Sequence, residues 1–399
     1  MGGAAGRLVA TGRHFTTMKT LRLYYATNRR HKGADRWNPT GYDTKFSDDG
    51  AENLRFGWLE LAVDPALIAT NLAADSGFGP GKGNALADAL AAKVSKGGAK
   101  IGAFRETLDP AKSDAEQPPK AFGSQAMFQE LQEAMKASSD VLVYIHGFNV
   151  SWAEAVGSAL ALQESLNQPG PAKTTQQVLV VLFTWPSDGQ ALPYVSYKSD
   201  RTEARASGTA VGRALLKTRD FLFKVRTLDL RGRDVACGQE LHLLCHSMGN
   251  YVLQCALERM ADFTPRSSFP RMFEHIFLCA PDVDDNVLEP GLPLGALHEL
   301  TQHVTVYHNR GDVAMYVSDY TKGNSERLGH NGAARPAQVH NKVHQVDCTP
   351  IVSGLVEHSY YQDGRVNQDI RLSIASLPFD SSLRTRQRSE DLPNVWRLK

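Results

Sequence analysis

One short stretch, residues 240–257, constrains the fold of this chain more than any other; it reads ELHLLCHSMGNYVLQCAL. Apolar residues dominate Leu241–Cys245, which predicts a buried strand, and from Tyr251 onward they recur at helical spacing. Ser247 stands between the strand and the helix. A strand that turns sharply at a serine and continues as a helix lifts the hydroxyl clear of the sheet, beside the positive end of the helix. The alternative is a serine that only caps an ordinary helix.

Such a turn is crowded and strained, so it needs small residues on both sides of the serine. Gly249 meets this need two positions after Ser247. Two positions before it, Cys245 stands where glycine is usual. Cysteine is small and apolar, so we interpret this departure as compatible with the turn.

Strands and helices alternate from about residue 127 onward. Runs that are apolar throughout predict strands at Val141–Ile145, Val178–Phe183, Leu241–Cys245, His275–Leu278 and Val304–His308, with a weaker one at Lys342–Asp347. Helical spacing predicts helices at Met127–Ala137, 151–166 and Arg201–Phe223. Strands that are apolar on both faces need cover on both sides. We therefore expect an α/β fold with a mostly parallel sheet, helices on both faces and ligands at the carboxyl ends of the strands.

Composition narrows the class of protein. The 399 residues are 42% hydrophobic, enough for a large core, and a net charge of +1 argues against nucleic acid as a partner. The chain has no apolar run of about 18 residues, so no membrane span is expected. The five cysteines lack CxxC spacing, which argues against a metal site and, with no secretory signal, favours a reduced, cytoplasmic protein.

The chain divides into three parts. Residues 1–17 are expected to be a disordered leader. Residues 18–125 hold strands at Leu21–Tyr25 and Leu54–Val63 and read as a variable N-terminal extension packed on the core. Residues 126–399 form the catalytic core. The oligomeric state stays open.

Two loops at strand ends are candidates for substrate contact. His146-Gly147-Phe148 follows one apolar strand, and the glycine lets the backbone bend so that the Phe148 N–H points at a developing oxyanion. The N–H of Met248, just after the serine, supplies the second donor. The candidate substrate-binding residues are His146, Gly147, Trp185 and His246. Trp185 follows the next strand, and packing on the core is an equally good interpretation of it.

The acid and the base are expected downstream of the serine, in that order. Asp282 and Asp284 follow one strand and Asp312 follows the next. Asp312 is isolated from other carboxylates, as a buried Asp–His pair requires, because a neighbouring like charge would raise its pKa. Asp282 is the second choice for the acid.

Four histidines lie beyond Asp312, namely His330, His340, His344 and His358. His344 falls inside a predicted strand, and His330 and His340 fall in a polar loop. His358 follows the last strand and precedes a predicted helix, where this fold delivers its base. His358 is therefore the preferred base.

Six strings in order carry a family resemblance. They are YYATNR at 24–29, VYIHGFN at 143–149, FTWPSDG at 183–189, HSMGN at 246–250, APDVD at 280–284 and HSYY at 358–361. Together they resemble a bacterial family of α/β-hydrolases first catalogued as a domain of unknown function, DUF900. The resemblance implies the α/β-hydrolase fold and serine esterase activity, with Ser247 as nucleophile, Asp312 as acid and His358 as base.

The expected reaction is cleavage of a small-molecule carboxylic ester through an acyl-enzyme, with no metal or organic cofactor. Two alternatives stay open. An acyltransferase would use the same triad and pass the acyl group to an alcohol or amine. A non-catalytic binding protein would keep the fold without the chemistry.

Overall fold

The computed structural model describes residues 17–399 apart from 74–80, 110, 114–115, 136, 139, 170–176, 188–192, 230–238, 265–268, 316–325 and 353–357. The expected leader, except Thr17, lies outside the described residues, as does Cys237. The other four cysteines, Cys245, Cys255, Cys279 and Cys348, are free and buried.

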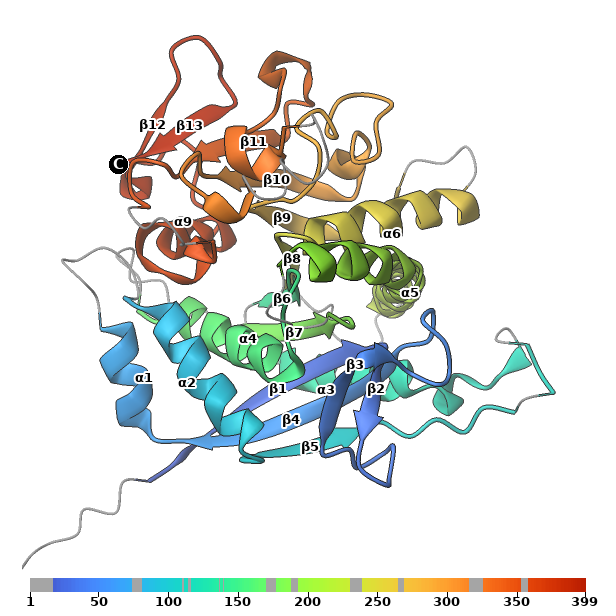
Figure 1. Cartoon of the computed structure of the whole chain (residues 1–399). Coiled ribbons are helices and arrows are strands. Elements are labelled where there is room, and N and C mark those ends of the chain that lie inside the picture. The colour runs from blue at the N-terminus through green and yellow to red at the C-terminus, as the bar shows by residue number, and fades with distance from the viewer. Residues whose placement is uncertain are drawn as a thin grey trace, which may run out of the picture.

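A single large sheet runs through the molecule (Figure 1). It has eleven strands in the order β12-β13-β11-β10-β9-β8-β6-β7-β1-β4-β5. Their bounds are β1 Lys19–Thr27, β4 Arg55–Val63, β5 Ala99–Ala103, β6 Asp140–Ile145, β7 Val178–Thr184, β8 Glu240–His246, β9 Phe273–Cys279, β10 Thr301–His308, β11 Val343–Asp347, β12 Arg386–Arg388 and β13 Val395–Leu398. A separate two-stranded hairpin joins β2 Arg29–Lys32 to β3 Gly41–Phe46.

The middle of the sheet is parallel and its two margins are antiparallel. Every neighbouring pair from β13 through β1 is parallel, whereas β4, β5 and β12 run antiparallel to their neighbours. Of these parallel strands, β6 to β10 were predicted from their apolar runs, because both of their faces are buried. Strands β5, β12 and β13, the hairpin and helix α1 were not predicted.

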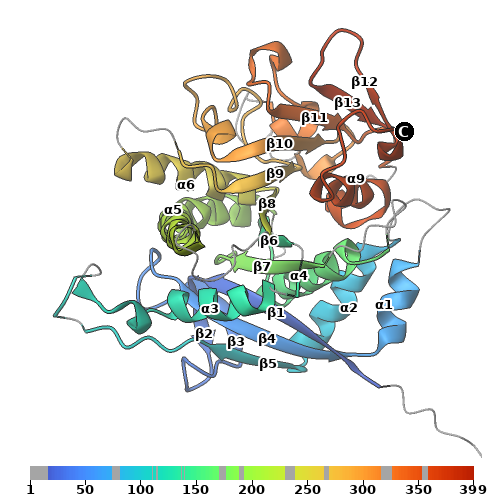
Figure 2. The same ribbon diagram turned by 180° about the vertical axis from the view of Figure 1, so that it is seen from behind.

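Helices cover both faces, as the apolar strands required (Figures 1 and 2). On one face, α1 Pro65–Leu72, α2 Gly83–Ser95, α4 Trp152–Leu166 and α9 Gly364–Ile374 pack in one hydrophobic cluster with Leu142 and Tyr144. On the other face, α3 Gly123–Met135, α5 Pro193–Asp229 and α6 Gly249–Phe263 pack with Val141 and Ile145. Successive side chains of β6 point to opposite faces of the sheet and so contribute to both hydrophobic clusters. A short helix, α8 Leu328–Asn331, follows β10.

The N-terminal strands belong to the same sheet as the core. Strand β1 pairs antiparallel with β4 over its whole length, and its last four residues, Tyr24 to Thr27, pair in parallel with β7. Among the described residues, no helix is both long enough and apolar enough to cross a membrane.

One buried and two partly buried histidines lie near the starts of three neighbouring strands. The rings of His275 on β9 and His303 on β10 lie 5.1 Å apart, and His344 on β11 stacks on Phe379 at 3.7 Å. Burial, with the charges of His303 and the nearby arginines, lowers the pKa of His344 to about 4 from its usual 6.5. Burial also lowers the pKa of His275 and His303. These rings are therefore neutral in the folded protein at pH 7.

We expect the free energy of unfolding to fall as the pH drops from 6.5 toward 4. A histidine whose folded pKa is lowered binds fewer protons folded than unfolded, so its contribution is complete above pH 6.5 and lost through that window. Urea denaturation at pH 7 and pH 5 measures the loss. Between pH 7 and pH 5, the free energy of unfolding should fall less in His344→Gln than in wild type. In His31→Gln, on the β2–β3 hairpin, it should fall as much as in wild type. Equal losses in wild type and His344→Gln would contradict this assignment.

Candidate active site

The turn between β8 and α6 has the geometry that the sequence predicted. Ser247 has a φ of +51°, a left-handed conformation that is strained for any residue with a side chain. Its N–H donates to the Cys279 carbonyl at 2.9 Å, and its own carbonyl accepts from the N–H groups of Asn250 and Asp282 at 3.0 and 3.2 Å. The backbone of the neighbouring strand β9 therefore holds the strained turn in place.

Asn250 also holds this turn through its side chain. It is fully buried in the first turn of α6, and its Nδ2 donates to the carbonyls of Cys245 and Ser247 at 3.1 and 3.0 Å. These carbonyls lie on both sides of the turn. One amide group thus ties the strand end to the serine.

Two glycines allow the close approach of β6 to the turn. A Cβ on Gly147 would lie 2.8 Å from the Cβ of Ser247, and a Cβ on Gly249 would lie 2.6 Å from the Ile145 carbonyl. Real side chains do not tolerate such contacts. The loop after β6 therefore lies directly against the serine, as the interpretation of Phe148 and Met248 as oxyanion donors requires.

Among the described residues, the N–H groups of Phe148 and Met248 donate no hydrogen bond to the protein. The Phe148 ring makes an edge contact with Tyr197 of α5 at 5.7 Å, and Met248 is fully buried at the start of α6. Two free N–H groups beside the serine can donate hydrogen bonds to a negatively charged oxygen.

Asp312 and His358 contact each other. Asp312 follows β10, and His358 precedes the 3-10 helix η5 Tyr360–Gln362. The His358 Nδ1 lies 2.7 Å from Asp312 Oδ2, and the other carboxylate oxygen accepts from the Ala314 N–H at 3.0 Å. The Asp312 side chain is 1% exposed and that of His358 is 17% exposed. This pairing holds the imidazole with Nδ1 occupied and Nε2 available.

The His358 pair lies next to the turn. The His358 carbonyl is 3.2 Å from His246 Nε2, and the two imidazole rings are 4.6 Å apart. Ser247 Oγ and His358 Nε2 are both buried, and neither has a hydrogen-bond partner among the described residues. The two atoms therefore make no hydrogen bond to each other, and neither is engaged by another group of the described residues.

The second candidate acid has other partners. Asp282 accepts from the Tyr197 hydroxyl at 2.8 Å and lies 3.4 Å from the Nε of the fully buried Arg327. Asp284 also pairs with Arg327. Of the three aspartates considered from the sequence, Asp312 is the one in contact with His358.

The other candidate histidines contact groups other than Ser247 and Asp312 among the described residues. His330 Nε2 contacts the Arg310 carbonyl, His340 stacks on His298, and His344 stacks on Phe379.

His146 and Trp185 are completely buried, which favours a structural role over substrate contact. Their rings stack 5.4 Å apart, and the Trp185 indole donates to the His146 carbonyl at 3.1 Å. The Trp185 N–H donates to His146 Nε2, so the ring proton stays on Nδ1 and points at the Gly147 carbonyl, 2.7 Å away. Burial and then the charge of Arg29 lower the pKa of His146 to about 3. His146 is thus a neutral support for the Gly147 loop.

His246, the remaining candidate for substrate contact, is also buried. Its ring lies 4.8 Å from that of Tyr361 as well as beside His358. Burial, followed by the neighbouring His358, lowers its pKa well below the usual value. Its contacts support the base.

Arg29 and Thr184 were not predicted to support the site. Arg29 is 1% exposed; its Nε donates to Thr184 Oγ1 at 2.9 Å and one guanidinium nitrogen donates to the Val150 carbonyl at 2.6 Å. Thr184 Oγ1 in turn lies 2.9 Å from His146 Nε2. Arg29 thus anchors both ends of the loop that carries Phe148. The string YYATNR was the only sequence signal for it.

The model of the family described as "Alpha/beta hydrolase of unknown function (DUF900)" matches residues 123–370. The chain belongs to this family. The DUF900 resemblance and the α/β-hydrolase fold expected from the sequence are thereby confirmed, and the protein is a hydrolase. The matched range begins at α3, so β1, β4 and β5 lie outside it.

A comparison with curated proteins found no match. Among solved structures, one described as a provisionally assigned cell surface hydrolase from Lactobacillus plantarum WCFS1 is 15% identical, with a TM-score of 0.33. The alignment covers 62% of this chain and 96% of that one. A similarity of this size carries no argument about function.

Replacing Asn250 by alanine is expected to lower the free energy of unfolding by about 1–3 kcal/mol, since it leaves buried carbonyls without a donor. Chemical denaturation measures the change. Asn331→Ala, which removes a side-chain bond to Glu326 at an exposed site, is the matched control and should change stability by less than about 0.5 kcal/mol. Equal effects would contradict a special role for Asn250 in the turn.

Proposed function

We propose that this DUF900 protein is a serine hydrolase that cleaves carboxylic esters of small molecules through an acyl-enzyme. The observation that carries the proposal is the 2.7 Å contact between Asp312 and His358, beside a serine held at positive φ. Family membership supports hydrolysis in general; the choice of ester bond rests on this geometry.

In the proposed first step, His358 Nε2 removes the proton of Ser247 Oγ as that oxygen attacks the ester carbonyl. Asp312 keeps the imidazole oriented and stabilises the imidazolium that forms. The N–H groups of Phe148 and Met248 stabilise the negative oxygen of the tetrahedral intermediate.

Collapse of that intermediate breaks the bond to the alcohol, and His358 returns its proton to the leaving oxygen. Water then attacks the acyl-enzyme as His358 accepts one of its protons, and collapse of this second intermediate releases the carboxylic acid while His358 returns the proton to Ser247 Oγ. No step needs a cofactor.

Ser247→Ala should reduce kcat for short p-nitrophenyl esters by about 10⁴-fold or more, as for other triad serines. Ser158→Ala, on helix α4, is the control and should retain wild-type activity. A fluorophosphonate probe should label the wild type and not Ser247→Ala. Near wild-type hydrolysis by a folded Ser247→Ala would remove the nucleophile assignment, and an inactive wild type would favour the binding-protein alternative. A new ester product in the presence of added alcohol would favour the acyltransferase.

Asp312→Asn should also lose about 10⁴-fold in kcat, as when a triad aspartate elsewhere is neutralised. Asp282→Asn is the matched comparison and should lose about tenfold at most, because Asp282 pairs with Tyr197 and Arg327. Circular dichroism and equal folded concentration control for stability. The reverse ranking would move the acid to the loop after β9 and leave Ser247 and His358 in place.

A further inference from the structure

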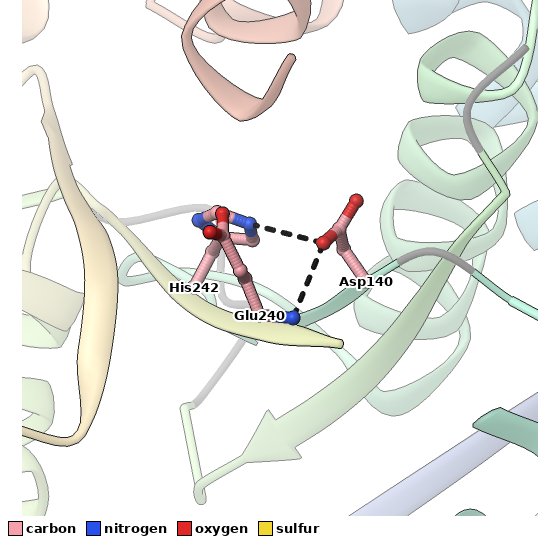
Figure 3. Close-up of side chains that lie close together, drawn as sticks. All are labelled: Asp140, Glu240 and His242. Atoms are coloured by element: carbon pink, nitrogen blue, oxygen red, sulfur yellow. Dashed lines mark hydrogen bonds and ion pairs between the residues drawn. The ribbon is translucent and has the colours of Figure 1, made fainter. Parts of the chain in front are cut away.

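Three potential metal ligands lie together where strands β6 and β8 begin, at the end of the sheet opposite Ser247. Asp140 begins β6 and Glu240 begins β8, and the two are paired across the parallel strands. His242 is two residues beyond Glu240, so it lies on the same face of β8. One ligand atom from each residue lies within 4.8 Å of the others (Figure 3).

His242 lacks the hydrogen bonds that a buried imidazole needs. Its side chain is 0% exposed, and neither Nδ1 nor Nε2 has a hydrogen-bond partner among the described residues. Its Nε2 points at Asp140 Oδ1 from 3.9 Å, too far for a hydrogen bond (Figure 3). Such a group costs free energy unless something else satisfies it.

A simple ion pair between His242 and Asp140 explains this arrangement less well. It would leave the carboxylate of Glu240 beside that of Asp140 with no ion pair of its own among the described residues. The charge of Arg271 reaches Glu240, but its guanidinium is paired with Glu274 at 2.7 Å. The cluster therefore has excess negative charge facing an unbonded imidazole nitrogen, which is the environment of a bound cation.

We propose that Asp140, Glu240 and His242 bind one Zn²⁺ ion. One imidazole nitrogen and two carboxylate oxygens form a mixed donor set that suits zinc better than Mg²⁺ or Ca²⁺, which prefer oxygen alone. Zinc ligands stand about 2.0–2.2 Å from the metal, so the donors need only move together by a small rotation of side chains. Glu240 is partly exposed and free to make that movement, and water completes the coordination.

The ion binds too far from Ser247 to take part in ester cleavage. Ser247 is seven residues beyond Glu240, about 23 Å along the strand direction. Its effect is on stability, because it links the starts of the two strands whose other ends carry the Phe148 loop and Ser247. The inference is thus independent of the proposed esterase activity.

Isothermal titration of the EDTA-dialysed full chain with Zn²⁺ is expected to show one site with a Kd of about 10 µM or tighter. The thermal midpoint should rise with Zn²⁺ and not with equal Mg²⁺ or Ca²⁺. Glu240→Gln and His242→Gln should each weaken binding by at least about 100-fold, since even outer-shell losses can reach that size. Ester hydrolysis at 25 °C should be the same with and without Zn²⁺.

His340→Gln is the matched control, because it removes an exposed imidazole, stacked on His298, that lies outside the cluster. It should bind Zn²⁺ as wild type does. If His242→Gln fails to fold, zinc binding by Glu240→Gln, a change at a partly exposed position, tests the proposal by itself. Absence of a site in wild type, undiminished binding by Glu240→Gln, or loss of binding in His340→Gln would each overturn the proposal.

Discussion

The left-handed turn at Ser247 is the constraint on which the rest of the site depends. A serine at φ +51° is unfavourable by itself, so the surrounding structure must hold it. The Cys279 carbonyl of β9 accepts from the Ser247 N–H, and the Asn250 side chain of α6 donates to carbonyls on both sides of the turn. Gly147, in the loop after β6, has no Cβ and so leaves room for the Ser247 side chain. Three elements thus converge on one residue, and the same convergence brings the two free N–H groups beside the hydroxyl.

The sequence predicted the parts of this arrangement that depend on local patterns. Strands buried on both faces have uninterrupted apolar runs, so β6 to β10 were recognisable without any knowledge of their partners. The serine turn was recognisable from its small neighbours. The pairing of His358 with Asp312 followed from chain order and from the isolation of Asp312 among acids. The structure places the two in contact, which family membership alone does not test.

The remaining features depend on contacts between distant segments, which local patterns do not reveal. His146 was a candidate for substrate contact because it stands at a strand end, and for Trp185 the sequence left substrate contact and packing on the core equally open. A position at a strand end does not say whether a side chain faces the cleft or the core, and both are buried. The role of Arg29 needed the pairing of β1 with β7, more than 150 residues later, which brings its guanidinium to Thr184. Strands β5, β12 and β13 are short and partly exposed, so they lack an apolar run.

Strands β6 and β8 run between the two ends of the sheet at which polar groups gather, with Asp140 and Glu240 where the strands begin and the Gly147 loop and Ser247 where they end. Their parallel register runs without a break from Asp140↔Glu240 to Ile145↔Cys245. Because a shift of one residue would exchange the two faces of each strand, this register decides whether Leu142 and Leu244 stay in one core and Val141 and Leu243 in the other. The same register sets the position of Gly147 against Ser247. A cation that joined Asp140 to Glu240 and His242 would therefore stabilise the register of β6 and β8 where the two strands begin. The close contact between the Gly147 loop and the serine, at the other end of the strands, depends on the same register.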